Sequence, residues 1–565
     1  MSSVSSTSLA QQAPTPALPN SGLPTREEVT PPPAPSAPDK PRLKVEGDIE
    51  RSACALSDPA YKDVRITLSG ATFNNLGPVS PAELAPVYQA YLGKDVSASA
   101  ICEIRDAAAT KLRQMGYLAA VQVPTQKIED GVVRFEVLYA RVVAVRVRGD
   151  AGKAETLIAS YLGKLTRDPV FNRNSAERYL LLARDLPGYD VRLALKPTGA
   201  APGELIGDIT VVRRPADIDA NIQNYASRAT GRFGGQIRGQ FYGLTGLGDR
   251  TSVALYSTAD FKEQQILQLG HDMRVGGEGL TLSGRFTYAW TKPEIAATTG
   301  VVKARTLFGT AEASYPFLRS QRANLTFAGG LDIVNQTVRF GGTPISRDRL
   351  RVAYLRVDGD VVDLNRAAAP AWRLAYTAEL RQGLDIFSAR EGFSGGVGSS
   401  RSDGDAESTS LRLSGLAEWT PGSNVTISLA PRAQYAFDPL MSFEEFSAGT
   451  YTIGRGYDPG TLIGDHGIGG TLEVRVNRLR PFTQLDATFQ PFVFVDSAWI
   501  WNKNAGIGAQ RLTSVGGGVR ASLSGHMRLD ATLAVPTKRA GLQPDRGDVR
   551  FLVSLTTKLF PWKAR

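Results

Sequence analysis

Residue types that carry out chemistry in enzymes are few in this chain and widely spaced. The three histidines, His271, His466 and His526, show none of the short spacings that metal ligands share. Asp465 precedes His466 and serines lie nearby, but no nucleophile elbow of the G-x-S-x-G type accompanies them. These residues therefore predict neither a catalytic triad nor a metal site. We predict that the chain is not an enzyme and holds no cofactor.

The chain contains only two cysteines, Cys54 and Cys102. A small even number is compatible with a disulfide bond formed in an oxidising compartment. It is equally compatible with two unrelated buried thiols. The residues alone leave both interpretations open.

The charge balance does not favour nucleic-acid binding. Lysine and arginine number 65 against 55 acidic residues, which gives a net charge of +10. The basic residues are scattered through alternating segments and form no dense stripe, and no nucleic-acid-binding motif is present. We therefore predict no nucleic-acid partner.

No segment has the pattern of a membrane-spanning helix, because a run of about 18 apolar residues is absent. The N-terminus also lacks a basic region followed by an apolar one, although Ser8 to Ala10 include the small residues that a signal-peptidase site favours. If the protein is exported, it needs a signal peptide, and we expect that peptide to lie upstream of this start or to have been removed.

Residues 1–50 are predicted to form a Pro-rich extension and linker. Prolines cluster between residues 11 and 42, and proline fixes φ and removes a backbone donor. Residues 51–140 then predict the order β-α-α-β-β, and residues 141–215 predict the same order again. Two successive α+β units are therefore expected. The helical spacing of the first unit is carried by Ile101, Ile104, Ala108, Leu112 and Met115.

From residue 216 to residue 565, apolar residues alternate with polar ones, as in strands with one apolar and one polar face. Such a body is either a soluble sandwich or propeller, or a membrane barrel. Arg and Asp on the polar face would be costly in a dry core, and several segments have the length of about 9–11 residues that crosses a bilayer. The sequence therefore favours an all-β transmembrane barrel. In one such segment Leu280, Leu282, Phe286, Tyr288 and Trp290 alternate with Thr281, Ser283, Arg285 and Thr287.

The most specific signature lies between residues 438 and 476, in the run Ile453, Gly454, Arg455, Gly456 and Tyr457. This segment resembles the sixth extracellular loop of the two-partner-secretion transporters. They form the TpsB family of haemolysin and filamentous-haemagglutinin transporters, within the outer-membrane assembly-factor superfamily. The family signature is (V/I)RGY, and an extra glycine precedes the arginine here. The two glycines beside Arg455 permit a close approach of the loop backbone to a barrel wall.

A second signature of the family, F-x-D on a late strand, is matched by Phe494 and Asp496. Strand periodicity places these two residues on one face and Val493 and Val495 on the other, so Asp496 is predicted to point into the lumen. The resemblance implies that Arg455 pairs with Asp496. An arginine fork can meet a carboxylate through two parallel hydrogen bonds. The alternative is an arginine and an aspartate that each face lumen water.

The resemblance covers about residues 50 to 565 and implies a complete architecture. The units at 51–140 and 141–215 look like the two POTRA domains of the family. The barrel at 216–565 is expected to have about 16 antiparallel strands, an even number as in other bacterial barrels. An in-folded loop is expected near residues 440–470. In the first POTRA domain, Cys54 would precede the first strand and Cys102 would begin the second helix, which makes a disulfide the favoured interpretation.

Two features depart from the family pattern. Family members usually begin with a helix that plugs the barrel, but residues 1–50 are too rich in proline for a long helix. Only Val4 to Ala13 are predicted to form a short one. At the other terminus, Phe560 is followed by Pro561, Trp562 and three further residues. The aromatic signal that insertion machinery reads is therefore displaced or is carried by Phe560 and Trp562.

By this resemblance the chain is expected to lie in the outer membrane of a Gram-negative bacterium, with its POTRA domains in the periplasm. These domains would recognise an unfolded exoprotein (an adhesin, haemolysin or toxin-like protein), and the barrel would secrete it. The other expected partners are outer-membrane lipid and the outer-membrane insertion machinery, and the barrel is expected to be monomeric. The alternative is an assembly factor that inserts other barrels, which predicts a labile seam between the first and last strands.

Overall fold

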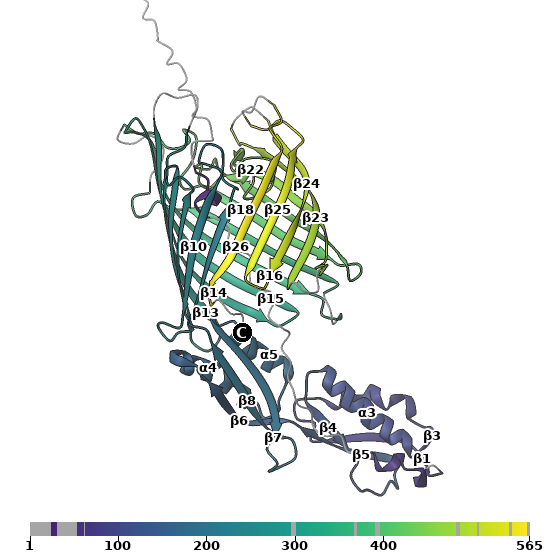
Figure 1. Cartoon of the computed structure of the whole chain (residues 1–565). Coiled ribbons are helices and arrows are strands. Elements are labelled where there is room, and N and C mark those ends of the chain that lie inside the picture. The colour runs from purple at the N-terminus through teal and green to yellow at the C-terminus, as the bar shows by residue number, and fades with distance from the viewer. Residues whose placement is uncertain are drawn as a thin grey trace, which may run out of the picture.

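The computed structural model describes residues 24–30, 54–61, 63–294, 301–366, 370–389, 396–481, 486–504, 508–541 and 545–561. Two small α+β units lie one after the other below a large β-barrel (Figure 1). The short helix predicted at Val4 to Ala13, and Trp562 at the C-terminus, lie outside the described residues. Within the described residues, no helix combines the length and the apolar character needed to cross a membrane.

The first α+β unit packs one long helix, α3 (Ser99–Gln114), against a three-stranded sheet. In this sheet β5 (Val132–Tyr139) lies between β2 (Gly70–Asn74), which is parallel to it, and β4 (Ala119–Gln122), which is antiparallel. The predicted apolar stripe of α3 forms the core of the unit. Its buried members are Ile101, Ile104, Ala108 and Leu112.

The beginning of this unit differs from the predicted order. The first predicted strand is β1 (Arg65–Thr67), and it pairs with β3 (Asp95–Ser97) in a separate two-stranded sheet. The first helix is predicted from Pro81 to Leu92, but the structure has only one turn of α-helix there, α2 (Pro81–Leu84). Pro86 explains this short length, because proline lacks the N–H that a helix interior needs. Short 3₁₀ turns lie at Ala55–Ser57, Pro59–Tyr61, Ala85–Val87 and Gln89–Tyr91.

Cys54 and Cys102 form a disulfide bond, which ties the segment before β1 to the first turn of α3. The Ser57 hydroxyl donates a hydrogen bond to the sulfur of Cys102. Because Cys102 lies on the buried face of α3, the bond fixes the entry of the chain to the core of the unit.

The second α+β unit has the predicted β-α-α-β-β order. Its sheet places β8 (Glu204–Arg213) between the parallel strand β6 (Arg141–Gly149) and the antiparallel strand β7 (Tyr189–Pro197). Two helices, α4 (Glu155–Leu162) and α5 (Arg173–Arg184), pack on this sheet, with 3₁₀ turns at Gly152–Ala154 and Gly163–Thr166. The core contains Leu157, Ile158, Leu162, Leu180, Leu186 and Ile209.

Sixteen antiparallel strands close the barrel, and the last of them, β26, pairs with the first, β9. This result confirms the predicted fold class. On β23, Val493 and Val495 are 60% and 44% exposed, whereas Phe494 and Asp496 on the inner face are buried. The strands are β9 (Ala216–Gln223), β10 (Gly234–Tyr242), β11 (Arg250–Thr258), β12 (Gln264–Val275), β13 (Leu280–Thr291), β14 (Val302–Arg319), β15 (Ala323–Phe340), β16 (Thr343–Val362), β17 (Trp372–Gly383), β18 (Thr409–Trp419), β19 (Val425–Ala436), β22 (His466–Val476), β23 (Ala487–Trp501), β24 (Gln510–Leu523), β25 (Met527–Pro536) and β26 (Arg550–Phe560).

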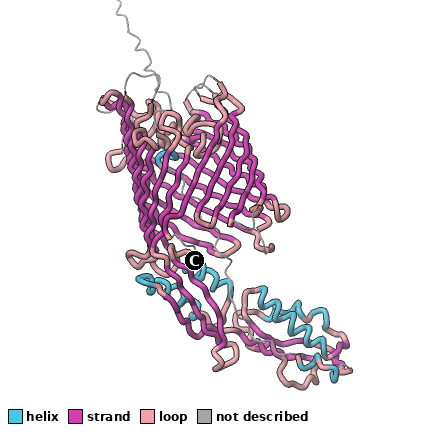
Figure 2. Tube along the Cα trace, in the orientation of Figure 1, coloured by secondary structure: helices cyan, strands magenta, loops and turns pink. Residues whose placement is uncertain are grey.

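The connection between β19 and β22 folds back against the inside of the barrel. We call it the lumen loop (residues 437–465). It contains a small hairpin of β20 (Phe446–Ala448) and β21 (Leu462–Gly464). Figure 2 shows loops gathered at the end of the barrel that lies away from the two α+β units. Apolar residues of the lumen loop and of the wall form one cluster, which includes Phe446, Ile453, Tyr457, Ile500 and Leu512.

One turn of helix, α1 (Arg26–Val29), also lies inside the barrel, where an extended linker was predicted. Its start is capped from both sides. The Thr25 hydroxyl accepts a hydrogen bond from the backbone N–H of Glu28, and the Glu28 carboxylate accepts one from the backbone N–H of Thr25. Val29 is fully buried in a cluster with Tyr256 and Phe308. We call residues 24–30 the plug segment.

Replacing both cysteines (Cys54→Ser with Cys102→Ser) should lower the free energy of unfolding of the first unit by about 4 kcal/mol, because the disulfide closes a loop over a sequence separation of 48. Limited proteolysis of the detergent-solubilised full chain at increasing temperature measures this change. A reductant should produce the same shift in the wild type and no shift in the double variant. An unchanged protease midpoint in the double variant would contradict the prediction.

Candidate functional site

The structure brings Arg455 of the lumen loop and Asp496 of β23 into direct contact. The guanidinium donates from Nε to Oδ2 at 3.2 Å and from Nη2 to Oδ1 at 3.1 Å, in the two-pronged geometry of a fork. The backbone N–H of Arg455 donates to the same carboxylate at 2.9 Å. Asp496 has no exposed surface, and the hydroxyls of Thr471 and Ser514 supply its remaining donors. We call this contact the loop lock.

Other wall residues surround the Arg455 guanidinium. It lies over the ring of Phe494, 3.4 Å from the ring centroid, and its Nη1 donates to Glu473 at 3.2 Å. Glu473 in turn accepts two hydrogen bonds from Arg520. The phenylalanine of the F-x-D motif therefore forms the platform on which the arginine lies.

Gly454 and Gly456 are required for the close approach of this loop to the wall. Gly454 has φ of +113°, and a Cβ there would lie 2.6 Å from Cδ1 of Leu512. A Cβ on Gly456 would lie 2.8 Å from Cβ of Ser514. Any larger residue would hold the loop away from the wall and would separate Arg455 from Asp496.

The rest of the loop motif also binds the wall. Ile453 is buried in the apolar cluster. The Tyr457 hydroxyl lies 2.7 Å from the carbonyl of Lys538 and 2.8 Å from that of Thr513, and Arg550 of β26 donates to the Tyr457 carbonyl. The motif thus joins the loop to several strands at once.

Sequence reasoning missed Asp458, which follows the motif. Its carboxylate pairs with Arg550 of β26 at 3.1 Å and with Arg232, between β9 and β10, at 3.2 Å. The lumen loop therefore contacts both sides of the point where the barrel closes. An acidic residue directly after the tyrosine was the available signal, but its partners are remote in sequence.

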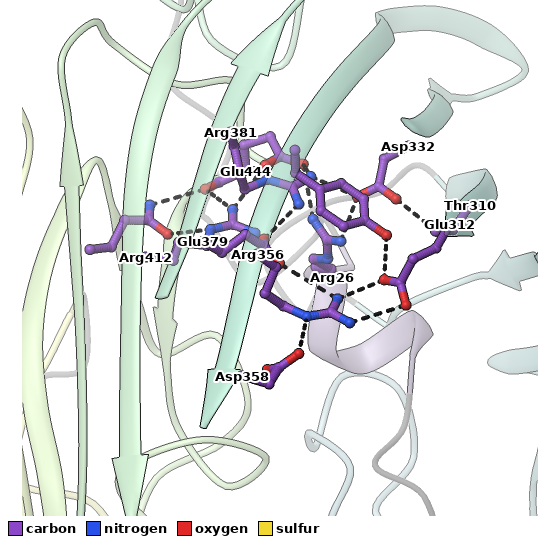
Figure 3. A network of polar contacts seen from close by, with 12 residues as sticks. Arg26, Thr310, Glu312, Asp332, Arg356, Asp358, Glu379, Arg381, Arg412 and Glu444 are labelled. Carbon is purple, nitrogen blue, oxygen red and sulfur yellow. Dashed lines mark hydrogen bonds and ion pairs between the residues drawn. The ribbon is translucent and has the colours of Figure 1, made fainter. Parts of the chain in front are cut away.

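A second cluster, the plug network, joins the plug segment to the wall and to the lumen loop (Figure 3). Arg26 donates to Asp332 of β15 at 2.7 Å and to Glu444 of the lumen loop at 3.1 Å. Arg381 of β17 donates to both of the same carboxylates at 2.7 Å. Arg412 of β18 adds a further hydrogen bond to Glu444 at 2.9 Å.

Burial makes these ion pairs directional and strong. Arg381 and Asp332 are each 1% exposed in their side chains, whereas Arg26 is 22% exposed. Although burial acts to raise the pKa of Glu444, the guanidinium groups of Arg381, Arg412 and Arg26 hold it below its ordinary range. The acid therefore stays ionised, and Arg26 forms the more exposed end of the network. The sequence signal for this segment was its capping box, Thr25-x-x-Glu28.

The remaining candidates have structural surroundings. The ring of His466 lies against those of Tyr435 and Trp501, and its Nδ1 accepts the backbone N–H of Ala436. His271 pairs with the Thr251 hydroxyl. In the described part of the chain, no group of three His, Cys, Asp or Glu residues is arranged to hold a metal ion.

A closed barrel with a lumen loop locked to its wall, preceded by α+β units, defines an outer-membrane β-barrel of the kind that carries POTRA domains. Residues 66–139 match the ShlB-type POTRA domain, and residues 209–521 match the family described as haemolysin secretion/activation protein ShlB/FhaC/HecB. The chain belongs to this family, which confirms the predicted resemblance. The barrel therefore lies in the outer membrane, with its POTRA region in the periplasm.

Known proteins and structures agree with this assignment. The heme/hemopexin transporter protein HuxB of Haemophilus influenzae is 24% identical over 193 residues, which is 33% of this chain and 33% of that protein. The chain thus spans about a third of the curated relatives it matches. CdiB from Escherichia coli has the same fold, with a TM-score of 0.71 and 15% identity over 87% of this chain and 90% of that one. CdiB from Acinetobacter baumannii gives 0.64 and 16%, over 93% and 94%.

Removing either partner of the loop lock should destabilise the barrel, because the other partner keeps an uncompensated charge. Arg455→Ala and Asp496→Ala should each lower the free energy of unfolding by about 3 kcal/mol, and the double variant by much less than the sum. Heat-modifiability on gels, across a temperature series, measures the barrel midpoint. Arg511→Ala, an exposed arginine on the neighbouring strand β24, is the matched control. Strictly additive effects of the two substitutions would contradict a direct pairing.

Docking of the plug segment should depend on pH. Burial raises the pKa of Glu28 from 4.5 to about 7, against the lowering effect of its hydrogen bonds with Thr25. Between pH 4.5 and about pH 7, Glu28 is protonated in the docked segment and ionised in the released segment. Docking is therefore strongest below the lower value and weakens as pH rises through the higher one.

Planar-bilayer recordings between about pH 5 and pH 8 should show open events becoming roughly tenfold or more frequent as pH rises. Glu28→Gln keeps a hydrogen-bond acceptor and does not titrate, so this variant should show a much flatter profile. Equal pH profiles in the variant and the wild type would exclude Glu28 as the titrating group.

Proposed function

We propose that the chain is a two-partner-secretion transporter. Its POTRA region recognises an unfolded exoprotein in the periplasm, and its barrel secretes that exoprotein across the outer membrane. The observation that carries this proposal is the polar attachment of two elements, the lumen loop and the plug segment, to the inner wall of a barrel from a secretion family. A wall whose polar groups can exchange one partner for another suits the passage of a polypeptide, because the polypeptide backbone presents hydrogen-bond donors and acceptors along its length.

The lumen beside the plug segment offers a hydrated path. A cavity of about 610 Å³ lies there, and charged side chains from several strands line it. Among these, Arg250 pairs with Asp272, and Arg356 pairs with Glu312. Because these charges are paired with one another, a passing chain would meet a wall with few unpaired charges.

The plug segment can leave without stranding a buried charge. After Arg26 withdraws, Asp332 still accepts from Arg381 and Thr310, and Glu444 still accepts from Arg381 and Arg412. The loop lock differs, because withdrawal of Arg455 leaves the buried Asp496 with hydroxyl donors alone. We infer that opening begins at the plug segment and that the lumen loop follows at a higher cost.

Capture of the cargo is assigned to the region 51–215, in the two units 51–140 and 141–215. Each unit has a sheet whose outer strands can accept an extended peptide through main-chain hydrogen bonds, which tolerates varied sequence. The barrel at 216–565 then acts as a monomeric conduit without enzyme activity, metal or cofactor. Its further partners are outer-membrane lipid and, during biogenesis, the insertion machinery.

The alternative of an assembly factor for other barrels predicts a labile seam between the first and last strands. Here β26 pairs with β9 from Ser554 opposite Gln223 to Phe560 opposite Ile218. The Asn221 amide adds hydrogen bonds to Ser554, Leu555 and Thr556 across this seam. These contacts favour a closed conduit over a barrel that opens at its side.

Deleting the gene should remove one or a few large exoproteins from the culture supernatant, because the proposed cargo crosses the outer membrane through this barrel. Quantitative proteomics of supernatant and outer-membrane fractions, with and without complementation, measures this loss. Arg455→Ala should secrete less cargo than the control Arg511→Ala at equal barrel levels. An unchanged supernatant with a general loss of other outer-membrane barrels would instead support the assembly factor.

A further inference from the structure

A cavity of about 930 Å³ lies where the second POTRA unit meets the periplasmic rim of the barrel. One wall comes from α5 and the turn before it. The other wall comes from the end of β14 and the turn that leads to β15, around residues 317–322. Transport of cargo, as proposed above, does not involve this cavity.

Positive charge predominates in the cavity lining, which includes two acidic residues, Asp168 and Glu177. The basic residues of the lining are Lys164, Arg167, Arg178, Arg319 and Arg322. Such an excess of arginine suits an anionic ligand, and the planar fork of arginine matches the oxygens of a phosphate.

Three of the basic residues hold the walls together. Arg178 of α5 donates to the backbone carbonyls of Pro316 and Phe317, and Arg319 forms a two-pronged pair with Asp185 at 2.6 and 2.8 Å. Lys164 pairs with Glu278, in the turn after β12, at 2.5 Å. These contacts fix the shape of the cavity.

The other two arginines are available to a ligand. Arg167 and Arg322 are both exposed. Within the described residues, the side chain of Arg167 makes no hydrogen bond or ion pair, and Nη2 of Arg322 lies 3.5 Å from Oδ1 of Asn365. They lie on opposite walls, one from the POTRA unit and one from the barrel.

The position of the cavity relative to the membrane identifies the source of the anion. Tyr315, Phe317, Leu318 and Phe327 are 37–64% exposed on the outer face of β14 and β15. The rings of Phe317 and Phe327 pack edge to face. Exposed aromatic residues at a barrel rim mark the depth of the lipid headgroups. Phe317 and Leu318 also line the cavity, so it opens at that depth.

We propose that this cavity binds the phosphate headgroup of an anionic phospholipid from the periplasmic leaflet. Arg167 and Arg322 contact the phosphate, and Phe317 and Leu318 contact the start of the acyl chains. A headgroup held between the two walls strengthens the attachment of the second POTRA unit to the barrel. This site does not depend on the identity of the cargo or on the secretion mechanism.

The test uses native mass spectrometry of the detergent-solubilised full chain with dioleoylphosphatidylglycerol, dioleoylphosphatidylethanolamine or inorganic phosphate. The wild type should retain phosphatidylglycerol in preference to the zwitterionic lipid. The variant Arg167→Gln with Arg322→Gln should retain it about tenfold less, given the attraction of each arginine to an anionic headgroup. The matched control, Arg146→Gln with Arg192→Gln, changes two exposed arginines of the same unit outside the cavity and should retain the lipid like the wild type.

Two results would overturn the proposal. Equal retention of phosphatidylglycerol by the cavity variant and the control would place the bound lipid elsewhere on the barrel. Retention of inorganic phosphate by the wild type without retention of lipid would assign the cavity to a soluble anion. Loss of phosphatidylglycerol retention in the cavity variant but not in the control, with the barrel still heat-modifiable, supports the lipid site and excludes misfolding of the barrel.

Discussion

A carboxylate with no exposed surface stands in the barrel wall at Asp496, and the arrangement of the lumen depends on satisfying it. An isolated charge in such a place would cost several kcal/mol, so some donor must reach it. Arg455 does so from a loop that enters from the extracellular end. The lumen loop is therefore held inside the barrel by the requirements of the wall as well as by its own apolar residues.

In the plug network, too, arginines satisfy buried carboxylates, but here the acids have more than one arginine partner. Asp332 and Glu444 are each shared by more than one arginine, and Arg381 reaches both acids. Because the acids are satisfied several times over, one arginine can be removed without leaving a buried charge alone. In the loop lock, Asp496 has no second arginine partner among the described residues. The same chemistry thus gives one contact whose loss leaves both acids paired with arginine, and one whose loss leaves a buried acid with hydroxyl donors alone.

Local periodicity was sufficient to predict the barrel and the long helix of the first POTRA unit. Strand alternation placed Val493 and Val495 on the outside of β23, and the spacing of Ile104, Ala108 and Leu112 placed them in a helix core. Pro86 shortened a predicted helix in a way that periodicity alone did not capture.

The candidate site was less accessible to sequence reasoning. The loop motif and the F-x-D motif pointed to Arg455 and Asp496 only through the family resemblance. The contacts of Arg26 span 306 and 418 residues of sequence, and they exist because a closed barrel brings distant strands around one lumen. No local sequence pattern predicts contacts between residues that lie so far apart in the chain. The capping box of the plug segment was a readable signal, but the surrounding prolines masked it.

The contacts of the two α+β units differ in kind. The second unit is joined to the barrel by charge-assisted bonds, of which the pair of Arg319 with Asp185 is two-pronged. The first unit meets the second through uncharged contacts. The backbone N–H of Arg173 donates to the carbonyl of Gly116, the Asn172 amide donates to the carbonyl of Met115, and Leu118 is buried in the core of the second unit. A neutral hydrogen bond is weaker than a charge-assisted one and orients its two partners less strictly. The second unit is therefore attached to the barrel entrance by charged contacts, whereas the first unit is attached to the second by neutral ones.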